Sequence, residues 1–184
     1  MSNGYNCWLK AEVMGFIDRL PLLESLQAQF QINWKGHHGI AHWARVRANG
    51  LMLAQLNGAN PHVVELFAWF HDSRRVNEYE DNGHGKRGAV LAKVLKGRFF
   101  EATDAEMDLL VQACSYHSDG LLEDDLTVMT CWDADRLDLG RVGIVPQPRY
   151  LCTAEARSDA MLERANNRSQ IWKKRFDASR RNLL

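Results

Sequence analysis

Apolar residues recur at helical spacing along almost the whole chain, and this pattern limits the fold more than any other feature of the sequence. Within residues 8–20, for example, Leu9, Val13 and Phe16 lie on one stripe of a helix. No segment alternates apolar and polar residues as a half-buried strand would, and no internal repeat is visible. The sequence therefore predicts an all-α fold, a bundle of helices without a sheet.

Capping residues and helix breakers divide this pattern into separate helices. Pro61 suits the first turn of a helix, and Thr103 with Glu106 forms a capping box. Polar residues 73–85 and the proline-containing residues 140–150 are expected to be loops. The predicted helices cover residues 8–20, 21–30, 38–56, 61–70, 87–97, 103–119 and 126–139, and a last, mostly polar helical region begins at Thr153.

The charge balance and the short apolar runs set several classes of protein aside. Lys and Arg number 23, as do Asp and Glu, so the net charge is zero, which argues against general nucleic-acid or anionic-membrane binding. The apolar runs fall far short of a membrane span, and no signal peptide is visible. Because the cysteines lack CxxC spacing, we expect reduced thiols in a cytoplasmic protein: Cys7, Cys114, Cys131 and Cys152.

A chain of 184 residues with this composition is expected to form one domain. Its C-terminal end differs from the rest in charge. Residues 164–184 contain seven basic residues and one acidic residue, so this segment carries +6 and the remainder −6. Such a segment is either the solvated face of a helix or an arm that binds an anion or a partner.

Histidine and aspartate residues stand beside apolar segments in at least four separate parts of the chain. Imidazole and carboxylate groups are ligands of Fe, Mn, Co, Ni and Zn, and helical bundles build metal sites from side chains on several helices. Each residue alone has a simpler explanation, because a single histidine on a helix is more often a core or surface residue. Together they indicate a metal site, for which the candidates are His42, His71, Asp72, His84, His117 and Asp135.

The sequences that flank these residues resemble the HD superfamily of metal-dependent phosphohydrolases, whose pattern is His…His-Asp…Asp. The matching segments are His42-Trp43-Ala44-Arg45-Val46, Phe70-His71-Asp72 and Ala134-Asp135-Arg136-Leu137. The resemblance covers about residues 38–140, with residues 1–35 and 150–184 as helical additions. It implies that a metal ion is held by His42, His71, Asp72 and Asp135. The Ala-Asp-Arg-Leu context selects Asp135 over Asp133.

Many members of the superfamily hold two metal ions, and two further histidines fit that pattern. His84 begins a His-Gly-x-x-Gly-Ala sequence, and His117 lies where another histidine is expected before the final Asp. The resemblance then implies that Asp72 bridges two ions, with His84 and His117 on the second. The alternative is a single ion, with these two histidines acting on the substrate or in proton transfer. Mg²⁺ is also compatible with the resemblance.

The chain departs from a common form of the motif, His-Asp-Ile-Gly-Lys, because it reads His71-Asp72-Ser73-Arg74-Arg75. Arg75 takes the place of the lysine, and a guanidinium group can bind a phosphate in bidentate fashion. We therefore expect Arg75 to bind the substrate, with further candidates in Arg74, Lys86 and His38. The alternatives are that His38 only lies near the pocket and that the arginines pair with acidic residues of the next loop, namely Glu78, Glu80 or Asp81.

The resemblance implies hydrolysis of a nucleotide or another small phosphate ester or anhydride. A divalent ion lowers the pKa of its bound water and neutralises phosphoryl oxygens. Asp72 or His84 would accept the proton of that water, and Arg75 would hold the phosphate. Two other functions share this ligand set: a mixed-valent di-iron oxygenase, of the kind that myo-inositol oxygenase represents, and a non-catalytic metal-binding regulatory module.

Overall fold

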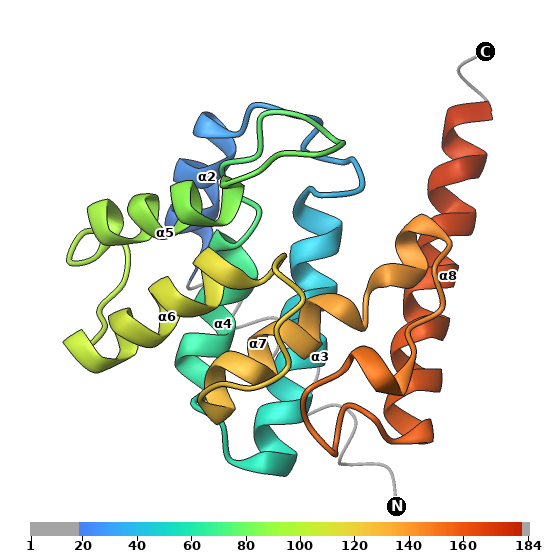
Figure 1. Cartoon of the computed structure of the whole chain (residues 1–184). Coiled ribbons are helices and arrows are strands. Elements are labelled where there is room, and N and C mark those ends of the chain that lie inside the picture. The colour runs from blue at the N-terminus through green and yellow to red at the C-terminus, as the bar shows by residue number, and fades with distance from the viewer. Residues whose placement is uncertain (1–18, 182–184) are drawn as a thin grey trace, which may run out of the picture.

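The computed structural model describes residues 19–181, which form seven α-helices and two 3₁₀-helices (Figure 1). The elements are α2 (Leu20–Gln29), α3 (Ile40–Asn57), α4 (Pro61–Phe70), α5 (His84–Leu95), α6 (Asp104–Tyr116), α7 (Leu126–Arg136), η1 (Leu139–Val142), η2 (Pro148–Tyr150) and α8 (Asp159–Arg181). In this part of the chain the β structure amounts to one isolated bridge, between Lys96 and Phe100. The all-α prediction is confirmed. The helix predicted over residues 8–20 lies almost entirely outside the described residues.

Helices α3 and α4 form the centre of the bundle. α4 begins as the sequence predicts: Pro61 stands in its first turn, and the Asn60 side chain accepts hydrogen bonds from the next backbone N–H groups. The helix is buried almost all round, because its neighbours cover several of its faces. Its buried residues are Val63, Val64, Leu66, Phe67, Ala68, Trp69 and Phe70. This burial fixes the position of the residues that follow directly, at the end of α4.

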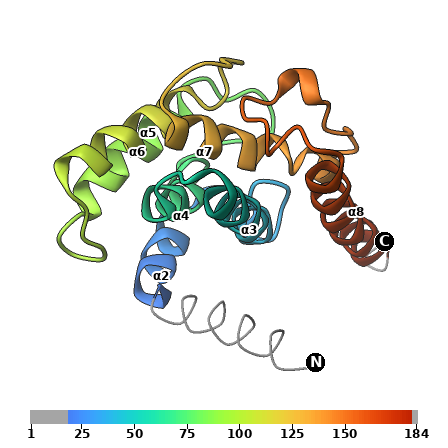
Figure 2. The ribbon, with the colours of Figure 1, turned by 90° about the horizontal axis from the view of Figure 1, so that it is seen from below.

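The other helices surround this central pair (Figure 2). α5, α6 and α7 lie along one side of it and α2 lies on the other, while α8 packs beside η1 and α3. α6 begins at the predicted capping box, in which Thr103 and Glu106 exchange hydrogen bonds. Within the described residues, none of the helices is both long and apolar enough to cross a membrane.

Several predicted boundaries differ from the structure by a few residues. α5 begins at His84 rather than near residue 87, because Gly83 adopts a left-handed conformation with φ of 87° and ends the loop earlier. α7 ends at Arg136, and the chain then turns into η1. The last helix begins at Asp159 rather than Thr153, because Thr153 donates its backbone N–H and its hydroxyl to the buried Asp133 carboxylate. That contact holds the connection against α7.

Candidate metal centre

Six side chains predicted from the sequence meet at one buried place among the helices. They come from α3 and α7, from the first residue of α5 and from the residues that directly follow α4 and α6. All but Asp135, whose side chain is 19% exposed, are more than nine-tenths buried. The six are His42, His71, Asp72, His84, His117 and Asp135. Residues up to 93 positions apart in the chain therefore share one site.

The first group of donors joins α3, α4 and α7. His42 Nε2 lies 3.1 Å from His71 Nε2, and Asp72 Oδ2 lies 3.5 Å and 3.6 Å from these two nitrogens. Asp135 Oδ1 lies 3.3 Å from His42 Nε2 and 3.9 Å from His71 Nε2. Four donor atoms from four residues thus face one small volume.

The second group lies on the other oxygen of Asp72. Asp72 Oδ1 is 3.1 Å from His84 Nε2 and 3.8 Å from His117 Nε2. The two histidine nitrogens are 2.9 Å apart. In each group, the two histidine nitrogens and the Asp72 oxygen lie close enough together to hold a metal ion. Asp72 stands between the groups and offers one oxygen to each.

All four histidines are oriented in the same way by a hydrogen bond at Nδ1. In three of them the acceptor is a backbone carbonyl, which accepts and never donates, so Nδ1 carries a proton and, in the neutral ring, Nε2 carries the lone pair. The fourth acceptor is a carboxylate oxygen. The pairs are His71 with the Phe67 carbonyl at 3.1 Å, His84 with Asp81 at 2.6 Å, His117 with Cys114 at 2.8 Å, and His42 with Asp138 Oδ2 at 2.7 Å.

This orientation makes the site fit a cation. The Nε2 lone pairs of His42 and His71 face each other at 3.1 Å and repel each other unless a positive charge lies between them. Asp135 Oδ1 is buried and has no hydrogen-bond partner among the described residues. Imidazole nitrogen and carboxylate oxygen are the donor types that divalent first-row metals bind. The first group of donors therefore suits such an ion.

The ionisation of these groups also suits metal binding. Burial lowers the pKa of His71 to about 3, which keeps its ring neutral at physiological pH. Burial alone would raise the pKa of Asp72 and Asp135, but the neighbouring histidine rings outweigh it and hold both values below the usual range. His117 differs, because contact with Asp72 raises its pKa against the effect of burial. The neutral His71 ring and the charged carboxylates of Asp72 and Asp135 are thus in the forms that coordinate metals.

Sequence reasoning missed Asp138, a fully buried residue that orients His42. Its carboxylate accepts from His42 Nδ1, from both Nε and Nη2 of Arg45 at 2.7 Å and 2.9 Å, and from the Ser169 hydroxyl of α8 at 2.6 Å. A carboxylate behind a ligating imidazole fixes the ring and raises its basicity. The helical spacing of three between Asp135 and Asp138 was the available signal.

Asp138→Asn is expected to weaken metal binding about 10- to 100-fold, because a neutral amide no longer supports the His42 ring as a carboxylate does. Competition with a chelator that reports free metal would measure the change. Ser169→Ala, which leaves the carboxylate in place, should weaken binding less. Equal affinities for the wild type and Asp138→Asn would show that Asp138 contributes packing alone.

Two buried arginines stand beside the donors. Arg75 Nη1 lies 3.3 Å from Asp72 Oδ1 and 3.2 Å from His84 Nε2. Arg141, which sequence reasoning did not select, places its Nη1 3.9 Å from Asp135 Oδ1. Its Nε donates to the His37 carbonyl at 3.0 Å, which fixes the guanidinium near the first group of donors. The site thus carries a positive charge at either side.

The remaining predicted substrate-binding residues lie away from the metal site or at its edge. Arg74 Nη1 donates to the Gln29 carbonyl at the end of α2, at 3.1 Å. Lys86 is exposed, with its Nζ 5.9 Å from the centre of a tyrosine ring. His38 Nδ1 contacts Glu78 Oε2 at 2.6 Å, where the loop after α4 meets the segment before α3 (Figure 1). The structure therefore brings His38 near the site and leaves Arg74 and Lys86 away from it.

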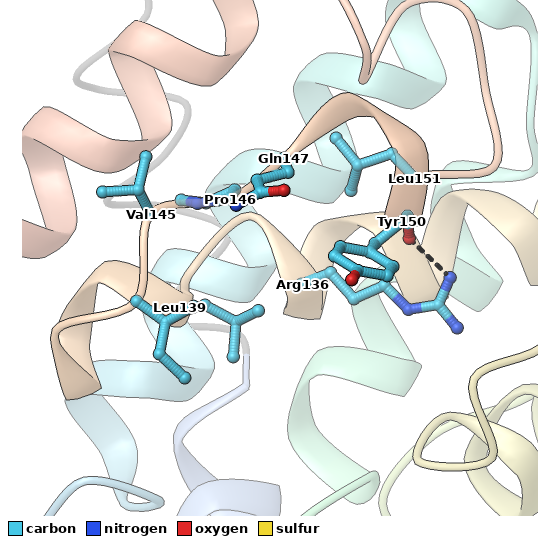
Figure 3. A pocket seen from close by; sticks show the side chains of 8 residues that line it. Arg136, Leu139, Val145, Pro146, Gln147, Tyr150 and Leu151 are labelled. Carbon is cyan, nitrogen blue, oxygen red and sulfur yellow. Dashed lines mark hydrogen bonds between the residues drawn. The ribbon is translucent and has the colours of Figure 1, made fainter.

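A separate small pocket opens where the end of α7 meets η1 and η2 (Figure 3). Arg136 donates to the Tyr150 carbonyl at one side of it. Its volume of about 60 Å³ accommodates a few water molecules but not a substrate of nucleotide size. None of the six candidate ligands lines it; the lining residues are Arg136, Leu139, Ile144, Val145, Pro146, Gln147, Tyr150 and Leu151.

Comparisons of the chain with protein-family models, with curated proteins and with solved structures find no match. Buried nitrogen and oxygen donors with fixed orientation can hold a divalent ion. The adjacent guanidinium groups can hold an anion next to that ion.

Proposed function

We propose that this protein is a metal-dependent phosphohydrolase of the HD superfamily, acting on a nucleotide or another small phosphate ester or anhydride. The observation that supports the proposal most is the buried meeting of His42, His71, Asp72 and Asp135, with Arg75 in contact with Asp72. These residues follow one another in the order of the superfamily motif. The buried arginine adds the anion-binding group that hydrolysis of a phosphate requires.

The ion would be held by His42, His71, Asp72 and Asp135. When bound there, a divalent ion supplies an activated water and neutralises phosphoryl oxygens. Two imidazoles in the ligand set favour Fe, Mn, Co, Ni or Zn over Mg²⁺, which prefers oxygen ligands. Solvent can reach the site beside Asp135, the one ligand with a partly exposed side chain.

The protein's own groups have distinct parts in the proposed reaction. Asp72 orients the attacking water and accepts its proton, while His84, whose Nε2 lies 3.1 Å from Asp72 Oδ1, helps to position that carboxylate. Arg75 and Arg141 hold the negative charge that develops on the phosphoryl oxygens. Their fixed hydrogen bonds mean that little reorganisation is needed when the substrate binds.

A phosphatase panel tests the proposal. The purified protein would be assayed against nucleotides and small phosphomonoesters with Mn²⁺, Co²⁺, Fe²⁺ and Mg²⁺, and His71→Ala would serve as the matched inactive control. We expect hydrolysis that requires metal and disappears in the variant. Oxygen consumption by an iron-loaded protein without hydrolysis would instead indicate an oxygenase. Metal binding without any turnover would indicate a regulatory module.

A further inference from the structure

We infer that the Arg75 guanidinium takes the place of a second metal ion, so that each chain binds one divalent ion and not two. The inference rests on the proposed function, because it concerns the same metal centre. It assigns different parts to the two groups of donors: the first group holds the ion, and the second group, which Asp72, His84 and His117 form, holds the guanidinium.

Arg75 contacts two of the three residues that a second ion would need, Asp72 and His84. Its Nη1 lies 3.3 Å from Asp72 Oδ1 and 3.2 Å from His84 Nε2. A neutral imidazole has a single lone pair on its unprotonated nitrogen, and the His84 Nδ1 proton is already directed at the Asp81 carbonyl. When Arg75 donates to His84 Nε2, that lone pair is no longer available to a metal.

The guanidinium is held in this position by the loop after α4. Arg75 Nη2 donates to the Tyr79 carbonyl at 2.6 Å, and Nε donates to the Asn77 carbonyl at 3.3 Å. The loop itself is closed by Asp81, whose Oδ2 accepts from the Val76 backbone N–H at 2.8 Å. Asp81 Oδ1 in turn accepts from an arginine of α5 at 2.6 Å. Arg75 is therefore a built-in part of the site, fixed through three of its nitrogens.

The balance of buried charge also favours a single ion. Three carboxylates and three guanidinium groups at the site cancel one another. One divalent ion then leaves two positive charges, which suits a phosphate dianion, whereas a second ion would leave four in a buried place. The six groups are Asp72, Asp135, Asp138, Arg45, Arg75 and Arg141.

This arrangement gives Arg75 a defined part in substrate binding. In sites with two metals, the ions act as a clamp on either side of the phosphoryl group. Here the clamp consists of one ion on the first group of donors and the guanidinium on the second. His84 and His117 then act as positioning residues for Arg75 and Asp72, and not as metal ligands.

Metal stoichiometry tests the inference, with Mn²⁺ as the probe. The wild type, Arg75→Met and Arg74→Met would be dialysed against excess Mn²⁺ and analysed for bound metal per folded chain. Met is uncharged and similar in length, and Arg74 provides a matched control because it points to α2. We expect one ion in the wild type and in Arg74→Met, and two in Arg75→Met, with the affinity for the second ion raised on the order of 100-fold. Arg75→Lys, which keeps the charge, should bind one.

Electron paramagnetic resonance of the Mn²⁺-saturated wild type gives an independent reading that needs no variant. We expect the spectrum of an isolated ion. A spectrum of two coupled ions, or two bound ions in the dialysis, would overturn the inference while leaving the proposed function standing. A single ion in well-folded Arg75→Met would overturn it as well. If the wild type bound no ion, the proposed function would fail together with the inference.

Discussion

Asp135→Ala is expected to abolish tight metal binding. Asp135 Oδ1 lies 3.3 Å from His42 Nε2, is buried and has no hydrogen-bond partner among the described residues, so its contribution is directed at the ion. Structural four-ligand zinc sites bind with apparent free energies of about 10–16 kcal/mol, so an equal share for one ligand is about 3 kcal/mol. That loss corresponds to roughly 100-fold weaker binding. Titration against a chelator that competes for Mn²⁺ or Zn²⁺ would measure it.

Asp133→Ala provides the matched control, because Asp133 lies two residues away on the same helix and faces elsewhere. Its carboxylate accepts from the Cys152 backbone N–H at 2.7 Å and from the Thr153 N–H and hydroxyl, both at 2.8 Å. Removing it should cost stability, about 1.5–3 kcal/mol for each hydrogen bond to a charged group, and spare the metal. The reverse pattern, with metal lost only in Asp133→Ala, would show that the wrong carboxylate has been assigned.

Removing the metal with a chelator is expected to lower the thermal unfolding temperature by about 8–16 °C. An ion present at a thousand times its dissociation constant stabilises the folded state by about 4 kcal/mol. For a chain of this length each kcal/mol shifts the midpoint by about 2–4 °C. The physical reason is the repulsion among the buried Nε2 lone pairs and carboxylates of the first group, which the ion relieves.

Thermal unfolding followed by circular dichroism, with and without added Zn²⁺ after dialysis against chelator, would measure this shift. Asp135→Ala should show only a small difference between the two conditions. Equal midpoints for the wild type in both conditions would mean that the donors do not share an ion in the folded state.

Much of the fold was predictable because its helices are encoded locally. The caps of α4 and α6, Asn60 with Pro61 and Thr103 with Glu106, lie where the helices begin. The beginning of α5 was missed because it depends on Gly83 adopting a positive φ, and an Asn-Gly sequence equally suits a longer loop. The start of α8 was missed because a tertiary contact, Thr153 with Asp133, holds the preceding segment.

The candidate ligands were predictable from their order and flanking residues, whereas for Asp138 the sequence held only a weak signal, its spacing of three from Asp135, and for its partner on α8 it held none. Asp138 connects His42 of α3 with Ser169 of α8, residues 127 positions apart, so its part depends on how α8 packs against η1. The close approach of α8 requires Gly140, where a Cβ atom would lie 2.8 Å from Ser169 Cβ. No local pattern in the sequence reports such a contact.

The directions of the two adjacent arginines were likewise not predictable from the sequence. Arg74 and Arg75 both follow the His-Asp pair, and the sequence cannot tell which of them turns inward. Their directions are set by partners from other parts of the chain: the Gln29 carbonyl draws Arg74 to α2, while Asp72 and the Tyr79 carbonyl hold Arg75 in the site. Arg75 points inward because the loop after α4 has the conformation that the Asp81 hydrogen bond to the Val76 backbone stabilises.

X-ray absorption of the Zn²⁺-loaded protein tests the central claim, convergence of histidine Nε2 atoms and carboxylates on one ion, most directly. The account predicts a first shell of nitrogen and oxygen at about 2.0–2.2 Å, together with the outer-shell scattering of imidazole rings. Asp135→Ala serves as the control and should lose the ion at the same metal concentration. A sulfur shell at about 2.3 Å, or a shell of oxygen without imidazole scattering, would contradict the account.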